Sequence, residues 1–268
     1  MAVITQAIAP GPVQLFRWGV SDSLVMMRRN LLVWVRVPAY IVFTIVQPVI
    51  FVLLFRYVFG GAIAVQVPGG YVSYLMPGIT GQTAAFATFA TAIALAQEAK
   101  QGVVDRLRSL PMARSAFLVG RLGADAVRML VTILVIVAVG YAVGFRFQNG
   151  VPSAIGMILL AELFGVTLAC IAAYIGLAIR DEESVQAFGL IWLFPLTFVS
   201  SAFVQVSSMP TWLQGFANNQ PVTLVINTMR ALALGPPLQP ELWQSLAWLG
   251  GILLVFVPLA VRAYRRVG

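Results

Sequence analysis

The chain has 268 residues, of which 60% are hydrophobic and 10% charged, and its formal net charge is +8. Its mean hydropathy of +0.92 lies far above the range of soluble globular proteins, and apolar stretches recur along the whole sequence. The positive charge gathers at the edges of these stretches, where anionic lipid head groups and membrane topology account for it better than nucleic acid does. We therefore expect an all-α polytopic membrane protein that binds no nucleic acid.

The N-terminal region predicts a helix outside the membrane spans. Residues 1–12 carry no positive charge and no apolar core, so we expect no cleaved signal peptide. Over residues 12–36, apolar residues recur at spacings of three and four, with Asp22 and Arg29 on the opposite face. This pattern is typical of an interfacial helix, which acts either as a plain anchor or also in coupling. The apolar stripe consists of Val13, Phe16, Val20, Leu24, Met27, Leu31 and Val35.

Six apolar segments are long enough to cross a hydrocarbon core of about 30 Å as helices. They predict one transmembrane domain over residues 1–268, with a six-span bundle at 38–263. A cytoplasmic N-terminus places all but Arg56, Arg146 and Arg230 of the seventeen basic residues inside. Both termini are therefore expected on the cytoplasmic side of the cell membrane. The predicted spans are Pro38–Phe59, Tyr74–Ala96, Ala126–Phe145, Ser153–Ile179, Ala187–Val206 and Trp243–Ala263.

Between the second and third predicted spans lies a charged segment, Glu98–Asp125. Together with Arg128 it contains six basic and three acidic residues. Within it, the pattern predicts a short helix, Val103–Leu110, that ends before Pro111. About two turns of helix are unstable alone, so we expect this helix to dock on the lipid interface or in a groove of a partner protein. Its predicted apolar face is Val103, Val104, Leu107 and Leu110, and its polar positions include Asp105, Arg106 and Arg108.

Polar residues inside the predicted spans are the candidates for a substrate pathway. Glu162 lies near the middle of the fourth span, where a carboxylate is costly and commonly marks a function. It either meets a cationic or polar substrate, in a pathway with Thr80, Gln82 and Thr83, or ties two helices together through Gln82 or Thr83. The single cysteine, Cys170, is expected to be a small packing residue.

The segment from Ser207 to Gly235 is too polar for a simple span and too apolar for a free loop. Pro221 is expected to divide it into two short helices, the second of them Val222–Leu234. We interpret the segment as a re-entrant or interfacial hairpin on the outer face, which forms either a gate or a lid over the bundle. Its marker residues are Trp212, Asn219, Pro221 and Arg230.

Two residue types are too scarce for several kinds of chemistry. The chain contains no histidine, which excludes histidine-based triads, metal sites and proton relays. Its single lysine, Lys100, stands in EAKQG and does not match the phosphate-binding loop of ATPases. We therefore expect no catalytic residue, metal site or cofactor in this chain, with any ATP and Mg²⁺ bound by a separate protein.

Two segments carry a family resemblance. GVVDRLRSLPMARSAFLVGRLGAD resembles the cytoplasmic loop of ABC-2-type exporter permeases, in particular the daunorubicin-resistance group of actinobacteria. MPTWLQGFANNQPVTLVINTMRALALG is similar to the outer segment of that group. The resemblance implies a permease that exports an amphiphilic drug or lipid-like substrate, pairs with a second permease copy or a paralogue, and binds ATPase subunits. It also implies that Val103–Leu110 is the coupling helix and that residues 12–36 form a connecting helix.

Alternatives from other classes have less support. A secondary carrier would need internal repeats and ion-coupling charges within the membrane. An intramembrane enzyme would need a nucleophile, an acid–base pair or a metal cluster. The sequence shows none of these clearly, so a carrier that is not coupled to ATP stays the main alternative.

Overall fold

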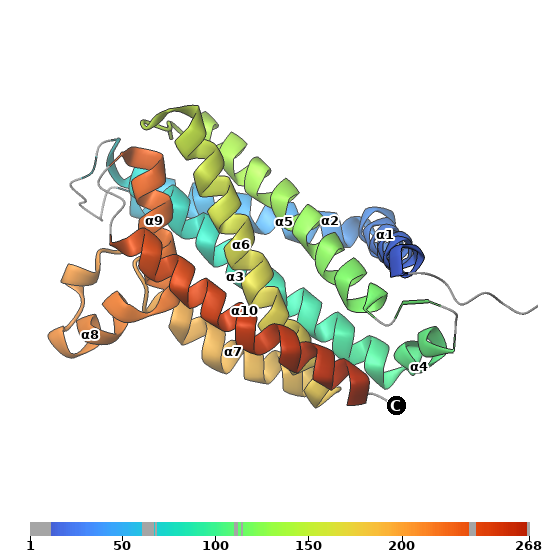
Figure 1. Ribbon diagram of the computed structural model, residues 1–268. Helices are drawn as coiled ribbons and strands as arrows, with labels where there is room; N and C mark the ends of the chain where they lie inside the picture. The colour runs from blue at the N-terminus through green and yellow to red at the C-terminus, as the bar shows by residue number, and fades with distance from the viewer. Residues whose placement is uncertain are drawn as a thin grey trace, which may run out of the picture.

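The computed structural model describes residues 12–60, 67, 69–109, 112–113, 115–235 and 240–266, and every regular element within these ranges is helical (Figure 1). The elements are α1 (Pro12–Arg36), α2 (Pro38–Leu54), the π-helix η1 (Phe55–Phe59), α3 (Gly70–Lys100), α4 (Val103–Arg108), α5 (Ala116–Ala142), α6 (Gly150–Ile179), α7 (Glu182–Phe198), the 3₁₀-helix η2 (Val206–Ser208), α8 (Thr211–Asn219), α9 (Pro221–Leu234) and α10 (Glu241–Arg266).

Five of the described helices are long and apolar enough to cross a membrane. They are α2 continued by η1, α3, α5, α6 and α10. They contain four of the six predicted spans and most of a fifth, Ala126–Phe145, which runs three residues past the end of α5. The prediction of an all-α membrane protein is thus confirmed. The predicted fifth span corresponds to α7, which has 17 residues and is shorter than the other five.

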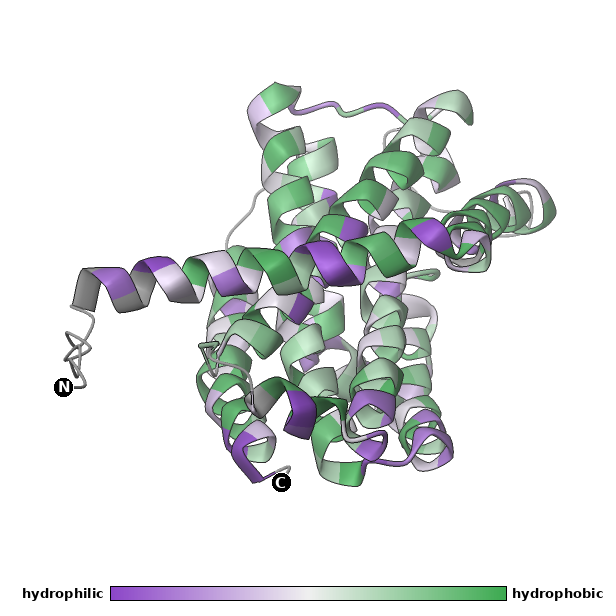
Figure 2. Cartoon of the chain, turned by 90° about the vertical axis from the view of Figure 1, so that its right-hand side faces the viewer, coloured by the Kyte–Doolittle hydropathy of each residue, from purple (hydrophilic) through white to green (hydrophobic). Residues whose placement is uncertain are grey.

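The helix α1 lies crosswise at one end of the bundle, as the two views of Figures 1 and 2 show. A Cβ added to Gly120 of α5 would lie 2.5 Å from the Cβ of Met26, so the missing side chain allows close packing. The Asp22 carboxylate accepts a hydrogen bond from the Ala113 amide (2.8 Å), and Arg29 pairs with Glu98 of α3 (2.8 Å). The face of α1 that carries Asp22, Met26 and Arg29 therefore meets the bundle, while Leu24 and other apolar residues stay exposed.

The charged segment Glu98–Asp125 is not a free loop, and the predicted start of the third span at Ala126 is wrong by ten residues. The helix α5 begins at Ala116, so Arg121 and Asp125 lie within it. Both side chains are buried because they pair with each other and with neighbours inside the bundle. A hydropathy pattern scores these charges as solvent-exposed, since it does not include their partners.

The predicted fifth span, Ala187–Val206, also has the wrong bounds. The helix α7 begins at Glu182 and ends at Phe198. The side chain of the preceding residue, Asp181, caps its start by accepting a hydrogen bond from the Ser184 amide (3.0 Å). Beyond Phe198 the Ser200 hydroxyl accepts a hydrogen bond from the Ala202 amide (3.2 Å). Such local side-chain bonds compete with the helical ladder, so residues 199–205 turn away from the helix despite their apolar composition.

Two main groups of buried residues hold the described helices together. The larger group fills the space between α3, α5, α6 and α9. The smaller group lies at the end of the bundle that also carries α4. It joins six helices, through residues that include Met26, Leu95, Val104, Phe117, Leu177 and Tyr264. The rings of Phe117 and Tyr264 stack with their centroids 5.3 Å apart.

Candidate functional site

The helix α4 packs on the chain's own core. Val104 is fully buried in the smaller core group, and the half-buried Leu107 packs against the same group. The expectation that this apolar face docks on lipid or on a partner protein is therefore wrong for Val104, because residues of α1, α3, α5, α6 and α10 already cover it. Leu107 is covered only in part. Leu110 and the side chain of Arg108 lie outside the described residues.

The outer side of α4 is polar. Asp105 and Arg106 are exposed, and neither forms an ion pair with another described residue. The preceding Gly102 adopts a φ of +67°, which only glycine tolerates easily, and this lets the chain turn sharply between α3 and α4. The geometry thus exposes a short charged face on a helix whose other face is anchored in the bundle.

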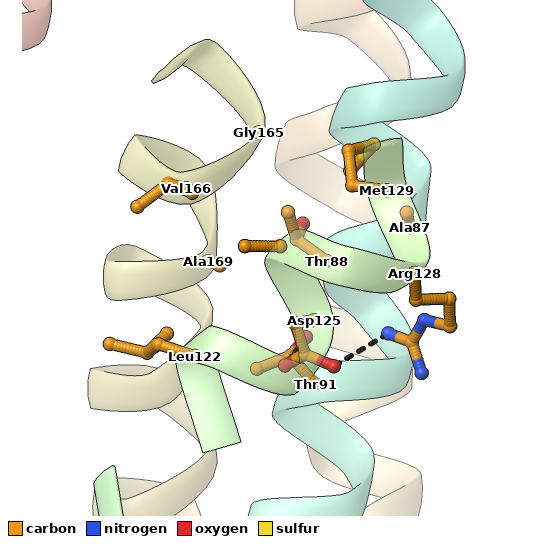
Figure 3. Close-up of a pocket in the computed structure, with 11 residues that line it drawn as sticks. Ala87, Thr88, Thr91, Leu122, Asp125, Arg128, Met129, Gly165, Val166 and Ala169 are labelled. Carbon is orange, nitrogen blue, oxygen red and sulfur yellow. Dashed lines mark hydrogen bonds and ion pairs between the residues drawn. The ribbon is translucent and has the colours of Figure 1, made fainter. Parts of the chain in front are cut away.

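Next to this end of the bundle lies a buried charge cluster on α5. The Asp125 carboxylate accepts hydrogen bonds from Thr91 of α3 (2.7 Å), Arg121 (3.3 Å) and Arg128 (2.8 Å). Figure 3 shows the Asp125–Arg128 pair at the edge of a small pocket between α3, α5 and α6. Because three donors satisfy one carboxylate, this cluster explains how charged residues remain within the helix bundle.

The loop between α6 and α7 is a charged turn at the same end of the bundle. Asp181 binds the Ser184 amide and pairs with Lys100 (3.2 Å) at the end of α3. The Ser184 hydrogen bonds, followed by the interaction with Lys100, hold the pKa of Asp181 below its ordinary value of 3.8. Asp181 therefore stays ionised at neutral pH and links α3 to the start of α7.

Glu162 lies on α6 and is half-buried. Neither of its carboxylate oxygens has a hydrogen-bond partner among the described residues. The predicted helix tie to Gln82 or Thr83 is therefore not formed. The carboxylate is the one acidic group of the described long helices that has both oxygens buried and unpartnered, which makes it the most distinctive polar group in this part of the chain.

The other proposed pathway residues lie on α3, and none of them forms a hydrogen bond with Glu162. Thr80 is fully buried, and its hydroxyl donates to the Met76 carbonyl within the same helix (2.9 Å). Gln82 is buried and Thr83 half-buried. Cys170 is a buried free cysteine, as expected of a packing residue.

The predicted break at Pro221 is confirmed. Pro221 is the first residue of α9, where its missing N–H is tolerated, and α8 ends just before it at Asn219. Trp212 and Asn219 on α8 are exposed, whereas α9 is mostly buried against the bundle. The segment is therefore a helix pair with one exposed and one inserted arm (Figure 1).

Arg230 of α9, which the charge count assigned to the outer side of the membrane, is buried within the protein. Its guanidinium donates to the Tyr74 carbonyl (3.2 Å), the Asn227 side chain (2.8 Å) and the Ser201 carbonyl (2.8 Å). It also stacks over the Tyr74 ring at 3.7 Å from the centroid. Sequence reasoning missed Tyr74 and Ser201, because the main signal was an unusual arginine in an apolar segment, and its partners lie on other elements.

Comparison with known proteins gives an independent result. Residues 22–234 match the model of the family described as "ABC-2 type transporter". The chain is 32% identical over 246 residues to the daunorubicin resistance ABC transporter permease protein DrrB1 of Streptomyces coeruleorubidus, covering 92% of this chain and 87% of that protein. It is 31% identical over 258 residues to a protein of Mycobacterium tuberculosis named "probable doxorubicin resistance ABC transporter permease protein DrrC", covering 96% and 93%.

A more distant relative is the inner membrane transport permease YadH of Escherichia coli, 23% identical over 237 residues, with 86% of each chain covered. The match of the family model extends from α1 to the end of α9 and so includes α4 and the helix pair at Pro221. The chain therefore belongs to the ABC-2 type transporter family, and it is the transmembrane permease subunit of an ABC exporter.

Proposed function

We propose that a separate ATPase powers this permease by pressing on the exposed face of α4 at the cytoplasmic membrane surface. The observation that carries the proposal is the anchoring of α4: Val104 is fully buried among residues of five helices. A force on Asp105 and Arg106 would be transmitted through Val104 to α1, α3, α5, α6 and α10, since all of them contribute to that core group. The ATP and Mg²⁺ would bind to the partner and not to this chain.

The charge distribution supports an orientation with both termini in the cytoplasm. The end of the bundle that carries α4 also carries Lys100 and Arg180, and α10 ends there with Arg262, Arg265 and Arg266. Positive charge at short loops and helix ends favours the cytoplasmic side. In this orientation α7 counts as a sixth, shorter span, and α8 with α9 forms a re-entrant hairpin on the outer face.

A second permease subunit, a copy or a paralogue, would complete the pathway. The helix α2 leaves Val46, Ile50 and Leu54 exposed along its length. Together with α10 it has the smallest buried share among the five long apolar helices. Two such subunits would enclose a route for an amphiphilic drug or a lipid-like molecule. The names of the relatives from Streptomyces and Mycobacterium, which refer to daunorubicin and doxorubicin resistance, support the drug class.

The coupling proposal is tested by reversing one charge on α4. Purified permease carrying Arg106→Glu is reconstituted with the ATPase that co-purifies with the wild type, and drug-stimulated ATP turnover is measured. We expect stimulation to fall at least about tenfold, since a like-charge contact at an interface costs several kcal/mol. The matched control is Arg265→Glu, which makes the same charge change at the same end of the bundle but on α10.

Unchanged stimulation in Arg106→Glu would overturn the role of α4. Transport in proteoliposomes that lack any ATPase but carry an ion gradient would instead establish a secondary carrier. Membrane insertion of both variants is checked by protease protection, so that loss of turnover is not mistaken for loss of the protein.

We further propose that Glu162 contacts a cationic group of the substrate as it passes. The support is its pair of unpartnered carboxylate oxygens within a membrane helix, where a free carboxylate is costly. Glu162→Gln should slow export of a cationic drug while leaving export of a neutral analogue unchanged. Glu183→Gln, an exposed acid at the start of α7, is the control, and equal export of both drugs by Glu162→Gln would disprove the contact.

A further inference from the structure

Residues near the ends of α6 and α10 line a groove. These two helix ends lie at the same end of the bundle as α4 (Figure 1). It encloses about 710 Å³, including its open mouth. Its polar lining residues are Arg180, Arg262 and Arg266, and its apolar lining residues include Tyr174 and Leu259. Neither the coupling role of α4 nor the pathway residue Glu162 uses this groove.

Three arginines from two helices converge on this groove. Arg262 and Arg266 lie one turn apart on α10, so both project from the same face. Arg180 directly follows the last residue of α6 and has a φ of +57°. Its guanidinium donates to the Leu177 carbonyl (3.2 Å) and to the Arg266 carbonyl (2.9 Å). These two bonds fix Arg180 at the groove and leave further N–H groups of the guanidinium free to donate.

The positive charge of the groove is not neutralised within the described part of the chain. None of the three arginines forms an ion pair with a described residue. Two neighbouring acids bind elsewhere, since Asp181 pairs with Lys100 (3.2 Å) and Glu182 accepts a hydrogen bond from Gln97 (2.6 Å). The third, Glu183, is exposed at the start of α7 and does not line the groove.

Helix dipoles explain only part of this arrangement. Carbonyl groups at the ends of α6 and α10 favour a basic residue in the last turn, which accounts for single arginines there. They do not account for three arginines that line one groove beside apolar side chains. Guanidinium groups bind phosphate through paired N–H donors, and basic pockets between membrane helices suit anionic lipid head groups.

We propose that this groove binds an anionic phospholipid, with the lipid phosphate at Arg180, Arg262 and Arg266 and an acyl chain along Tyr174 and Leu259. The ligand is a lipid and not free phosphate because the same groove is lined by apolar side chains as well as by the three arginines. The inference goes beyond the export function and does not depend on it. It assigns a role to the three arginines that transport itself does not require.

Native mass spectrometry of the detergent-purified full-length permease tests the proposal. Phosphatidylglycerol or phosphatidylcholine is titrated into the wild type, into the double variant Arg262→Gln/Arg266→Gln, and into the control Arg36→Gln/Arg265→Gln. The control loses the same charge at exposed residues outside the groove. We expect the double variant to lose phosphatidylglycerol affinity at least about tenfold, with the control unchanged, because only the double variant removes charge-assisted hydrogen bonds to the phosphate.

Three results would overturn the proposal: equal phosphatidylglycerol affinity in the double variant and the control, equal affinity of the wild type for phosphatidylcholine, or displacement of the lipid by millimolar inorganic phosphate. The last would identify a free-anion site. If the double variant does not fold, the single variant Arg262→Gln is used, and a loss of about threefold relative to Arg265→Gln is then expected, since it removes one of the two contacts.

Discussion

Arg230 is a buried arginine that binds only neutral groups. Its three hydrogen bonds and its stack on Tyr74 connect α9, α3 and the segment after α7. A fixed planar fork of donors makes this possible, because each acceptor lies in a different direction from the guanidinium. The hydroxyl of Tyr74 donates to the same Ser201 carbonyl (3.0 Å), so both side chains stabilise one bend of the chain.

The substitution Arg230→Lys tests this geometry at constant charge. A lysine lacks the planar fork and cannot reach all three acceptors, so buried carbonyl groups would lose their partners. We expect the free energy of unfolding to fall by about 2 kcal/mol or more. Thermal unfolding followed by tryptophan fluorescence measures this, with the exposed Arg36→Lys as the matched control. An unfolding midpoint equal to that of the wild type would contradict the assigned role of the fork.

Close approach of α3 and α6 depends on glycine at one position. A Cβ added to Gly176 would lie 2.3 Å from the Ala92 carbonyl oxygen, which belongs to the backbone of α3. At Gly165, by contrast, an added Cβ would meet the flexible end of Met129 at 2.9 Å. The backbone of a packed helix moves less readily than a methionine side chain. The two glycines on α6 are therefore expected to tolerate substitution differently.

We expect Gly176→Ala to lower the unfolding midpoint by several degrees, because overpacking typically costs about 1–3 kcal/mol. Gly165→Ala should change it much less, because Met129 can adopt another rotamer. Both variants are measured in the same detergent by fluorescence-detected thermal unfolding. Equal shifts in the two variants would show that the Ala92 contact does not limit the helix separation.

The positions of most helices were predictable from the sequence. The predicted bounds were wrong where a polar side chain has its hydrogen-bond partner far away along the chain. Hydropathy located α3 and α6 because apolar runs of sufficient length need no partner to be recognised. It placed the start of α5 too late, because Thr91, which binds Asp125, lies 34 residues earlier. It extended α7 too far, because the bend at Ser201 depends on Tyr74 and on Arg230.

The candidate sites were predictable to a similar degree. The periodicity of Val103, Val104 and Leu107 correctly indicated a short helix with one apolar face. It could not show that the face packs on the chain itself, because the covering residues, such as Met26 and Tyr264, come from distant parts of the sequence. Glu162 was recognisable as a charge within a span, whereas the absence of a partner became apparent only from the packing of α6.

At the scale of the whole molecule, the core group around Val104 joins the polar end of the bundle to most of the long helices. The substitution Val104→Ala removes part of the side chain that makes this contact and adds no charge. We expect the amount of drug exported per ATP hydrolysed to fall several-fold, because α4 would move without moving the other helices. The free energy of unfolding should fall by about 1–2 kcal/mol, as for other buried large-to-small changes.

The control for Val104→Ala is Val185→Ala, which truncates an equally buried valine of α7 in a separate core group. Both transport and ATP turnover are measured in the same proteoliposomes. If the two variants export the same amount of drug per ATP, loss of general stability and not loss of coupling accounts for the effect.

The early end of α7 has a mechanical consequence for the end of the bundle that lies opposite α4 (Figure 1). Residues 199–205 are held to α3 and α9 through Tyr71, Tyr74 and Arg230 by bonds to backbone carbonyls. A continuous helix at residues 199–205 could stretch or bend gradually. The bend that replaces it is expected to keep or lose its hydrogen bonds to Tyr71, Tyr74 and Arg230 together. The parts of α3 and α9 near Tyr74 and Arg230 should therefore tilt as one rigid body, and the hinge motion of a transport cycle should fall in the helices around them.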